Sequence, residues 1–317
     1  MKKRVLVYGW YGSKNTNIGD LLFKDAFIKL FPQFDFTFVD LINEGLANSF
    51  DIFFFGGGSF LDSPPNISLP ALNIIKTKKL FYIGVGADGN INQVHQDLIK
   101  HSLLIALRSD SQFVRELNIN TILIPDIVYS LKPAKIKQKE KSNSILILPN
   151  INIIPKHNES LYKYNAFESF KTEMAQFCDA LIEKDYIVDF LAMCENIGLD
   201  DTNCAIEIIN RMINNKSPKI IKTYNILEAL SDYDLIITQR LHGIILSQMA
   251  ETPYIAISHH DKLNNFQYKT GAHIDYYGVS KNILLRETFK ALKWEGRCFT
   301  DIEFFKELCV KINELLD

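Results

Sequence analysis

The chain has few of the features that mark membrane-spanning or secreted proteins. None of its apolar runs reaches the roughly 18 residues that cross a bilayer. The charged start Met1–Arg4 leads into the short apolar run Val5–Tyr8 and then Gly9, which is too short for the core of a signal peptide. We therefore expect a cytoplasmic protein, with peripheral contact at the inner face of a membrane left open.

Paired cysteines and a strong net charge are also missing. The five cysteines form no C-x-x-C pair, and an odd number argues against a disulfide framework. The net charge of -2 provides no basic field for nucleic acid, so we do not expect a polynucleotide partner. His259, His260 and Asp261 are adjacent in one predicted loop and make a poor metal set, so no metal is expected. His95, His101 and His157 are expected at the surface.

Short apolar runs alternate with helical spacing along the chain. The charged, polar stretch 132–143 separates one such set from a second and is typical of an exposed linker, although a long loop within one domain remains an alternative. We predict an α/β protein of two doubly wound, Rossmann-like domains facing a cleft, with boundaries 1–140 and 141–317. The strands are predicted at 5–8, 36–39, 51–55, 81–83, 104–107, 121–124, 144–148, 187–191, 219–222, 235–237 and 253–258.

Two loops in the first half could hold a polar or anionic ligand. Asn17-Ile-Gly-Asp20 precedes a predicted helix, where backbone N–H groups suit an anion, although Asp20 could simply cap that helix. Three glycines, Gly56 to Gly58, end a predicted strand and permit positive φ and a close ligand approach. Ser59 and Asp62 follow them. We favour a ligand-binding loop here over a plain turn.

Two further loops are weaker candidates. Gly84-Val-Gly-Ala-Asp88-Gly89 matches the dinucleotide pattern G-x-G-x-x-G, but it follows the fourth apolar run rather than the first, which favours a loop lining the cleft. Arg108 stands at the end of a predicted strand, where Ser109 or Asp110 could cap the next helix. Arg108 is either a second anion clamp or a surface arginine.

The most informative stretch is Asp234-Leu-Ile-Ile-Thr-Gln-Arg240-Leu241-His242. Its apolar run predicts a buried parallel strand, and ligands of open α/β sheets collect at the carboxyl ends of strands. Arginine offers a planar fork for carboxylate or phosphate, and histidine titrates near neutral pH. The pair suits an anionic substrate that exchanges a proton. The alternative is a structural corner, with Arg240 paired to a carboxylate and His242 capping the helix.

With these motifs in order, the sequence resembles the polysaccharide pyruvyl transferases over about residues 5 to 270. Before the arginine this family often has a small and then a bulky residue, where Thr238 and Gln239 stand here, and this departure bears on the acceptor more than on the reaction. The matching stretches are Asn17–Asp20, Gly56–Asp62, Arg108–Ser111 with Pro125-Asp126, and Asp234–His242 through Lys262.

The resemblance implies a fold similar to the two-domain GT-B glycosyltransferases. It also implies transfer of pyruvate from phosphoenolpyruvate (PEP) to two hydroxyls of a sugar, giving a cyclic ketal on a surface polysaccharide or its lipid-linked precursor, with no cofactor. In this picture His242 is the general acid and Asp62 the base, with Asp20 and Asp88 as alternative bases. The substrate-binding residues would be Arg240, Leu241, Arg108, Lys262, Asn17, Asp20, Gly57, Gly58, Ser59 and Asp88.

Two other functions fit the same sequence. A GT-B-like glycosyltransferase that uses a nucleotide sugar shares the architecture and the glycine loops, and a donor assay separates it from the PEP enzyme. A non-catalytic protein that binds a sugar or an anion is the second. The acceptor sugar, the hydroxyls that are bridged, the stereochemistry of the ketal and the oligomeric state cannot be predicted. Residues 150–165, with their tyrosines and polar groups, are a candidate acceptor surface.

Overall fold

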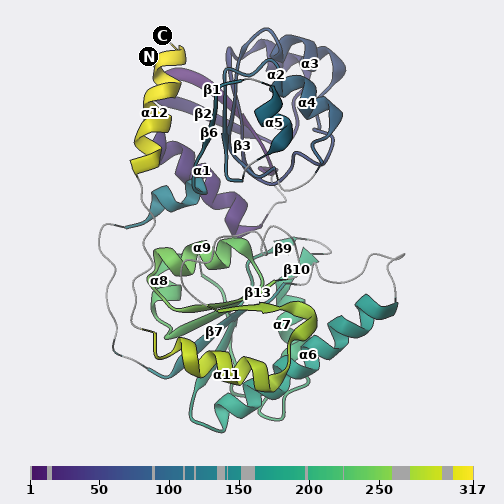
Figure 1. Ribbon diagram of the computed structural model, residues 1–317, viewed down its shortest axis with the longest axis vertical. Coiled ribbons are helices and arrows are strands. Elements are labelled where there is room, and N and C mark those ends of the chain that lie inside the picture. The colour runs from purple at the N-terminus through teal and green to yellow at the C-terminus, as the bar shows by residue number, and fades with distance from the viewer. Residues whose placement is uncertain are drawn as a thin grey trace. The chain divides into compact units, whose positions relative to one another are not determined.

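The computed structural model divides the chain into two units, each built on a parallel sheet (Figure 1). Unit 1 is Met1–Leu131 with Asp301–Asp317, and unit 2 is Lys132–Thr300. The chain therefore leaves unit 1 after residue 131 rather than 140, and its tail returns to unit 1 instead of belonging to the second domain as predicted. The structure describes residues 2–316 apart from 13–15, 88–89, 110, 118, 134–139, 141, 151–160, 197–198, 224, 259–271 and 295–302.

The sheet of unit 1 has six parallel strands in the order β2-β1-β3-β4-β5-β6. The strands are β1 (Lys3–Tyr8), β2 (Phe34–Val39), β3 (Ile52–Gly58), β4 (Lys79–Val85), β5 (Leu104–Leu107) and β6 (Thr121–Leu123). The helices are α1 (Ile18–Leu30), α2 (Glu44–Asn48), α3 (Leu69–Ile75), α4 (Gln93–Ile99), α5 (Gln112–Glu116), the 3-10 helix η1 (Ile127–Leu131) and the terminal α12 (Glu303–Leu316).

Aromatic side chains fill one face of this sheet. Phe23 and Phe27 of α1 and Phe31 at its end recur every four residues, so they form one buried helical stripe. Phe54 of β3 lies at the centre, with its ring centroid 6.1 Å from that of Phe27 and 5.4 Å from that of Phe81. This packing fixes the start of α1 against the carboxyl end of β3, where the glycine run lies.

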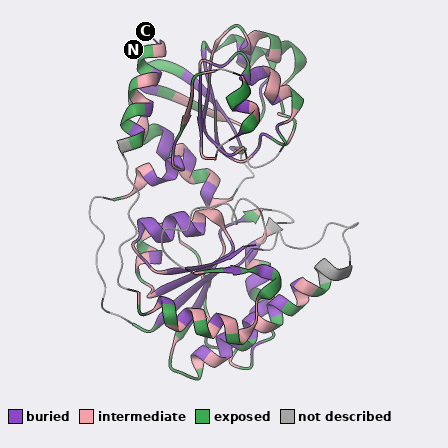
Figure 2. Ribbon diagram, in the orientation of Figure 1, coloured by how far each residue is buried: buried purple, intermediate pink, exposed green. Residues whose placement is uncertain are grey.

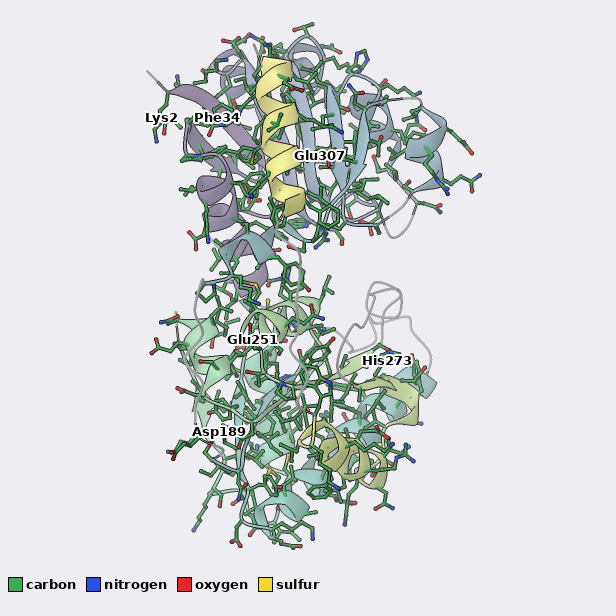
Figure 3. All side chains as sticks on the ribbon, turned by 60° about the vertical axis from the view of Figure 1, so that its left-hand side comes forward. Lys2, Phe34, Asp189, Glu251, His273 and Glu307 are labelled. Atoms are coloured by element: carbon green, nitrogen blue, oxygen red, sulfur yellow. The ribbon has the colours of Figure 1, made fainter. Side chains whose placement is uncertain are left out.

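Helix α12 packs in unit 1 through a buried face and through polar contacts at its C-terminal end. The carbonyl oxygen of Leu316 accepts hydrogen bonds from Lys3 Nζ at 3.1 Å and from Lys79 Nζ at 2.8 Å. Ammonium groups at a helix C-terminus satisfy carbonyls that have no partner within the helix. Its buried residues Phe305, Leu308, Ile312 and Leu316 share one face. Figure 3 shows α12 alongside the unit that contains Phe34, with exposed Glu307 labelled on it.

Unit 2 repeats the plan with the strand order β11-β8-β7-β12-β13-β14. The strands are β7 (Ser144–Leu148), β8 (Ile187–Leu191), β11 (Ile220–Ile221), β12 (Leu235–Thr238), β13 (Tyr254–Ser258) and β14 (Ala272–Asp275), with β9 (Glu195–Asn196) and β10 (Leu199–Asp200) pairing antiparallel apart from them. The helices are α6 (Leu161–Ile182), α7 (Asp201–Ile209), α8 (Ile226–Ser231), α9 (Leu241–Met249), the 3-10 helix η3 (Tyr276–Gly278) and α11 (Lys281–Ala291).

Burial follows the layers of each unit, with the strands and the inner sides of the helices buried (Figure 2). In α9 every residue from Gly243 to Met249 is buried. No helix among the described residues combines the length and the apolar character needed to cross a membrane.

Each sheet has one place where the chain reverses the direction in which strands are added. In unit 1 it lies between β1 and β3, and in unit 2 between β7 and β12. Ligands of doubly wound sheets bind outside the carboxyl ends of the strands at such a switch point. The residues that follow these strands are Gly9–Tyr11 and Ser59 in unit 1, and Pro149-Asn150 and Gln239–His242 in unit 2.

Candidate functional site

The glycine run of unit 1 is the end of β3 itself. Gly57 and Gly58 have φ of +75° and +98°, as the sequence predicted, and Gly58 still pairs with Val85 of β4. A Cβ on Gly57 would lie 2.5 Å from Phe23 Cγ and 2.7 Å from the hydroxyl oxygen of Tyr11. The space next to Gly57 is therefore filled by the protein's own side chains, those of Phe23 and Tyr11. Gly58 is more open, since its nearest neighbours would be at 3.8 Å or beyond.

Arg108 is a buried bridge at the ends of three strands. Its side chain, only 9% exposed, forms an ion pair with Asp126 and donates through Nη2 to Ser59 Oγ at 2.9 Å. Asp126 also accepts from the backbone N–H of Val128 at 3.0 Å. Arg108 is therefore not the surface arginine of the alternative reading. The hydroxyl of Ser109 accepts from Ala87 N–H at 3.2 Å, and Ser111 takes the N-cap position of α5, so the predicted capping by Ser109 is wrong.

The Asn17–Asp20 motif starts α1 beside the glycine run. Asn17 is the N-cap and accepts from Gly19 N–H at 3.0 Å, whereas Asp20 lies in the first turn, so Asp20 is not the cap. A Cβ on Gly58 would lie 3.9 Å from Asp20 Oδ1. Burial raises the pKa of Tyr11 well above its usual value, and the charges of Asp20 and Asp126 add to this, so Tyr11 keeps its proton.

Asp62 stands farther along the same loop and is exposed. Its Oδ1 accepts from Ser63 Oγ at 3.3 Å. His95 on α4 is fully buried, so the prediction of a surface histidine is wrong. Burial lowers the pKa of His95 to about 4, and the negative charge of Asp62 partly opposes that shift. The His95 ring is therefore neutral near pH 7, and its Nδ1 lies 3.2 Å from the Tyr82 hydroxyl.

In unit 2 the guanidinium of Arg240 is held by a carboxylate that the sequence did not single out for this role. Asp201, at the start of α7, is fully buried, and it accepts from Nε of Arg240 at 3.0 Å and from Nη2 in a two-point ion pair. The N-cap of α7 is Asp200, which accepts from Thr202 N–H at 2.8 Å. The ion pair uses the edge of the arginine fork that carries Nε and Nη2.

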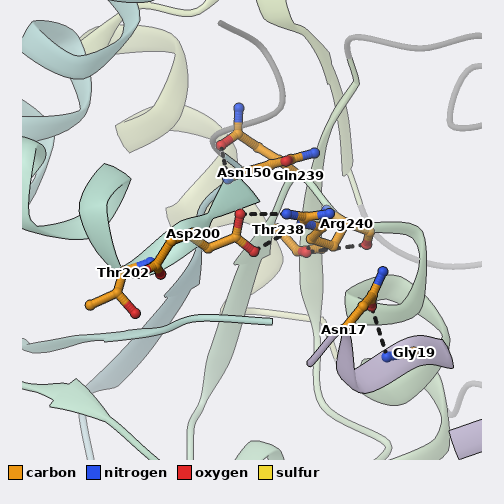
Figure 4. Close-up of polar contacts among 9 residues, drawn as sticks. Asn17, Gly19, Asn150, Asp200, Thr202, Thr238, Gln239 and Arg240 are labelled. Atoms are coloured by element: carbon orange, nitrogen blue, oxygen red, sulfur yellow. Dashed lines mark hydrogen bonds and ion pairs between the residues drawn. The ribbon is translucent and has the colours of Figure 1, made fainter. Parts of the chain in front are cut away.

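The first turn of α9 is seated directly on the end of β12. Thr238 Oγ1 accepts from Arg240 N–H at 3.0 Å and donates to the Arg240 carbonyl at 3.2 Å. A Cβ on Gly243 would collide with Thr238 Oγ1 and lie 3.2 Å from Leu148 Cδ2, so glycine permits this contact. Gln239, 2% exposed, accepts from Asn150 N–H at 3.0 Å and links the ends of β7 and β12 (Figure 4).

His242 is the second residue of α9, half-buried, with its Nε2 atom shielded from solvent. The structural-corner alternative is correct in one half, because Arg240 is paired with a carboxylate. It is wrong in the other, since Arg240 and not His242 occupies the N-cap position. Leu241 and His242 follow Arg240 directly, so all three lie at the switch point of unit 2. Asp88, Lys262, His259–Asp261 and 151–160 lie outside the described residues.

Several solved structures resemble this chain at low sequence identity. The UDP-GlcNAc 2-epimerase of Methanocaldococcus jannaschii matches with a TM-score of 0.64 at 10% identity, over 99% of this chain and 100% of that one. The UDP-N-acetylglucosamine 2-epimerase of Rickettsia bellii matches with a TM-score of 0.52 at 9% identity, over 100% and 96%. At these identities the likeness concerns the fold, and it confirms the predicted GT-B-like pair of doubly wound domains.

Sequence comparison gives a family. The family model described as polysaccharide pyruvyl transferase matches residues 14–261, which include every described site residue discussed above except those of β1 and its turn. No curated protein sequence shows significant similarity to the chain.

Proposed function

Because this chain belongs to the polysaccharide pyruvyl transferase family, we propose that it transfers pyruvate from PEP to two hydroxyls of a sugar. The product would be a cyclic ketal on a cell-surface polysaccharide or on its lipid-linked precursor. The observation that carries this proposal is the fixed guanidinium of Arg240 at the switch point of unit 2, two residues before His242.

PEP is a small dianion or trianion, and it needs cations that are fixed before it binds. The Asp201 carboxylate orients Arg240 and leaves part of its fork to bind the PEP carboxylate or phosphate. Leu241 follows Arg240 on the same helical turn. Arg108 is proposed as a second clamp through the N–H donors that Ser59 and Asp126 do not use. Lys262 is proposed to hold the departing phosphate as a point charge.

The proposed reaction balances without a metal or a redox cofactor. One sugar hydroxyl attacks C2 of PEP while His242 delivers a proton to C3, which becomes the methyl group. Asp62 takes the proton of the attacking hydroxyl, with Asp20 and Asp88 as alternative bases. The bond between C2 and the phosphate oxygen then breaks, and the second hydroxyl adds to C2. Its proton leaves with the phosphate, so one PEP and one diol give one ketal and one phosphate.

The test measures acceptor-dependent phosphate release from PEP, with a panel of galactose, glucose and mannose glycosides, and the mass of the product. We expect Arg240→Lys to raise the KM for PEP about tenfold or more, since lysine keeps a charge for Asp201 but loses the fork. We expect His242→Ala to lower kcat about 100-fold, the scale of losing a general acid. Arg211→Ala and His101→Ala, both exposed, are the matched controls and should behave as wild type.

Wild-type kinetics in both site variants would refute the assignment of Arg240 and His242. Transfer from a nucleotide sugar, without phosphate release from PEP, would instead establish the glycosyltransferase alternative. Binding of a glycoside or of PEP without turnover of either donor would indicate a non-catalytic binding protein.

A further inference from the structure

Trp10 stands out at the switch point of unit 1 because its ring is held outward. It is the second residue after the end of β1 and is 50% exposed. The N–H of Tyr11 donates to the carbonyl of Gly9 at 2.9 Å, so the backbone makes a tight turn with Trp10 at its centre. Tyr11 itself is buried at 5% exposure. The turn is therefore followed by a buried Tyr11, while Trp10 at its centre is exposed to solvent.

A carboxylate and the buried glycine Gly58 lie close to this ring. A Cβ on Gly58 would lie 3.8 Å from Trp10 Cδ1 and 3.9 Å from Asp20 Oδ1. The indole and the carboxylate thus both lie next to a residue that has no side chain and a φ of +98°. Ser59, which follows Gly58, accepts a hydrogen bond from Arg108 Nη2 at 2.9 Å.

We propose that Trp10 and Asp20, which both lie next to Gly58, form the platform on which unit 1 binds the acceptor sugar. A pyranose has a face of C–H groups that loses its contact with water when it covers an aromatic ring. Its rim of hydroxyls donates hydrogen bonds, which a carboxylate accepts. The negative charge of Asp20 disfavours phosphates there, so the platform selects a neutral sugar ring rather than PEP or a nucleotide. This assignment rests on the proposed pyruvyl transfer for the identity of the acceptor.

The first measurement uses the fact that the chain has only two tryptophans, Trp10 and Trp294. In a Trp294→Phe protein, the emission of tryptophan reports Trp10 alone. We expect a saturable change in this emission on titration with at least one of methyl β-galactopyranoside, methyl α-glucopyranoside and methyl α-mannopyranoside. PEP alone should leave the emission unchanged.

The second measurement separates binding of the sugar from binding of the donor. Trp10→Ala should raise the KM for the acceptor glycoside roughly tenfold and leave the KM for PEP unchanged, while Trp10→Phe should recover most of the affinity. Leu69→Ala, which also truncates an exposed apolar side chain, is the matched control and should keep both constants.

An unchanged acceptor KM in Trp10→Ala, or an emission that does not respond to a glycoside that supports turnover, would overturn the platform and leave pyruvyl transfer standing. If no glycoside supports phosphate release, the proposed reaction fails and the titration decides alone. A saturable change of the Trp10 emission with a glycoside would then support the platform, and an unchanged emission would overturn it.

Discussion

The carboxylate of Asp201 has no solvent-exposed surface and is paired there with the guanidinium of Arg240. Removing one partner of a buried ion pair leaves the other charge unpaired, which is strongly destabilising. The orientation of Arg240 is therefore tied to the stability of unit 2. A ligand that binds Arg240 meets a guanidinium whose position is already fixed.

Asp201→Asn tests this coupling. We expect the free energy of unfolding to fall by about 3 kcal/mol, because a neutral amide cannot balance the buried guanidinium. Urea denaturation followed by circular dichroism measures it. Glu287→Gln is the control, since Glu287 pairs with the exposed Arg286 and Lys290 and such pairs contribute little. Equal losses in the two variants would contradict a special role for Asp201.

The sequence could locate Arg240 and His242 but not the partner of Arg240. A short apolar run followed by Arg-x-His predicts a strand end whatever lies beside it. The ion pair to Asp201 spans 39 positions and depends on which strands are neighbours. One signal was present: two acids, Asp200 and Asp201, stand at a helix start where only one can be the N-cap. The same limit applies to Arg108 and Asp126, which come from different strand ends.

At the scale of elements, the candidate site residues of each unit depend on a helix that packs closely on the end of a strand. In unit 2 the first turn of α9 meets β12 at Gly243 and Thr238. In unit 1 α1 meets β3 at Phe23 and Gly57. Any added side-chain atom at these glycines would lift the helix start, and the residues of its first turn would move with it.

Gly243→Ala tests this contact. The new Cβ would collide with Thr238 Oγ1, so α9 must shift, and we expect about 2 kcal/mol of destabilisation. Activity should fall further than stability alone explains, because His242 moves with the helix. Thermal unfolding and phosphate release measure the two effects. Gly45→Ala in the exposed α2, where a Cβ would meet only Asn43 Oδ1 at 3.5 Å, should be neutral or slightly stabilising. A milder effect at Gly243 than at Gly45 would refute the packing argument.

The apolar pattern predicted most strands well but misplaced their ends. The strand predicted at 51–55 continues to Gly58, because glycines with positive φ still pair with β4 although they contribute no apolar side chain. The pattern of the second half stopped before β14 and α11, which follow the undescribed residues 259–271. Periodicity indicates which residues are buried, whereas strand pairing decides how far an element extends.

At the scale of the whole molecule, one buried histidine makes the stability of unit 1 sensitive to acid. The pKa of His95 is lowered by burial to about 4, from an unfolded value near 6.5. Above pH 6.5 the ring is neutral in both the folded and the unfolded state, so its titration does not lower the free energy of unfolding. As the pH falls from 6.5 towards 4, only the unfolded chain takes up the proton, so stability is lost, by about 3 kcal/mol in total.

His95→Phe should remove this sensitivity. Phenylalanine fits the aromatic surroundings of Phe55 and Phe60 and cannot titrate. We expect the wild-type melting temperature to fall more than that of the variant between pH 7 and pH 4.5. Calorimetry of both proteins at the two pH values gives the comparison, with His101→Phe, an exposed site, as the control. Parallel losses in wild type and His95→Phe would mean that another group titrates.

The division into two units was visible in the sequence as two sets of apolar runs, but the course of the chain between them was not. The tail has an ordinary amphipathic pattern that would suit either unit. Its place is decided by Lys3 and Lys79, which donate to Leu316 from positions 313 and 237 residues away. Contacts at such separations leave no trace in local periodicity, so the second boundary had to come from the structure.

The return of α12 to unit 1 sets an order of events during synthesis. Residues 132–300 are made as one uninterrupted segment before α12, so unit 2 can begin folding without any later part of the chain. The first unit begins earlier yet stays incomplete, with the apolar surface that Phe305, Leu308 and Ile312 later cover left open until α12 has been made. The half of the protein made first is thus the last to be finished, and that exposed surface is where a nascent chain would most need protection by a chaperone.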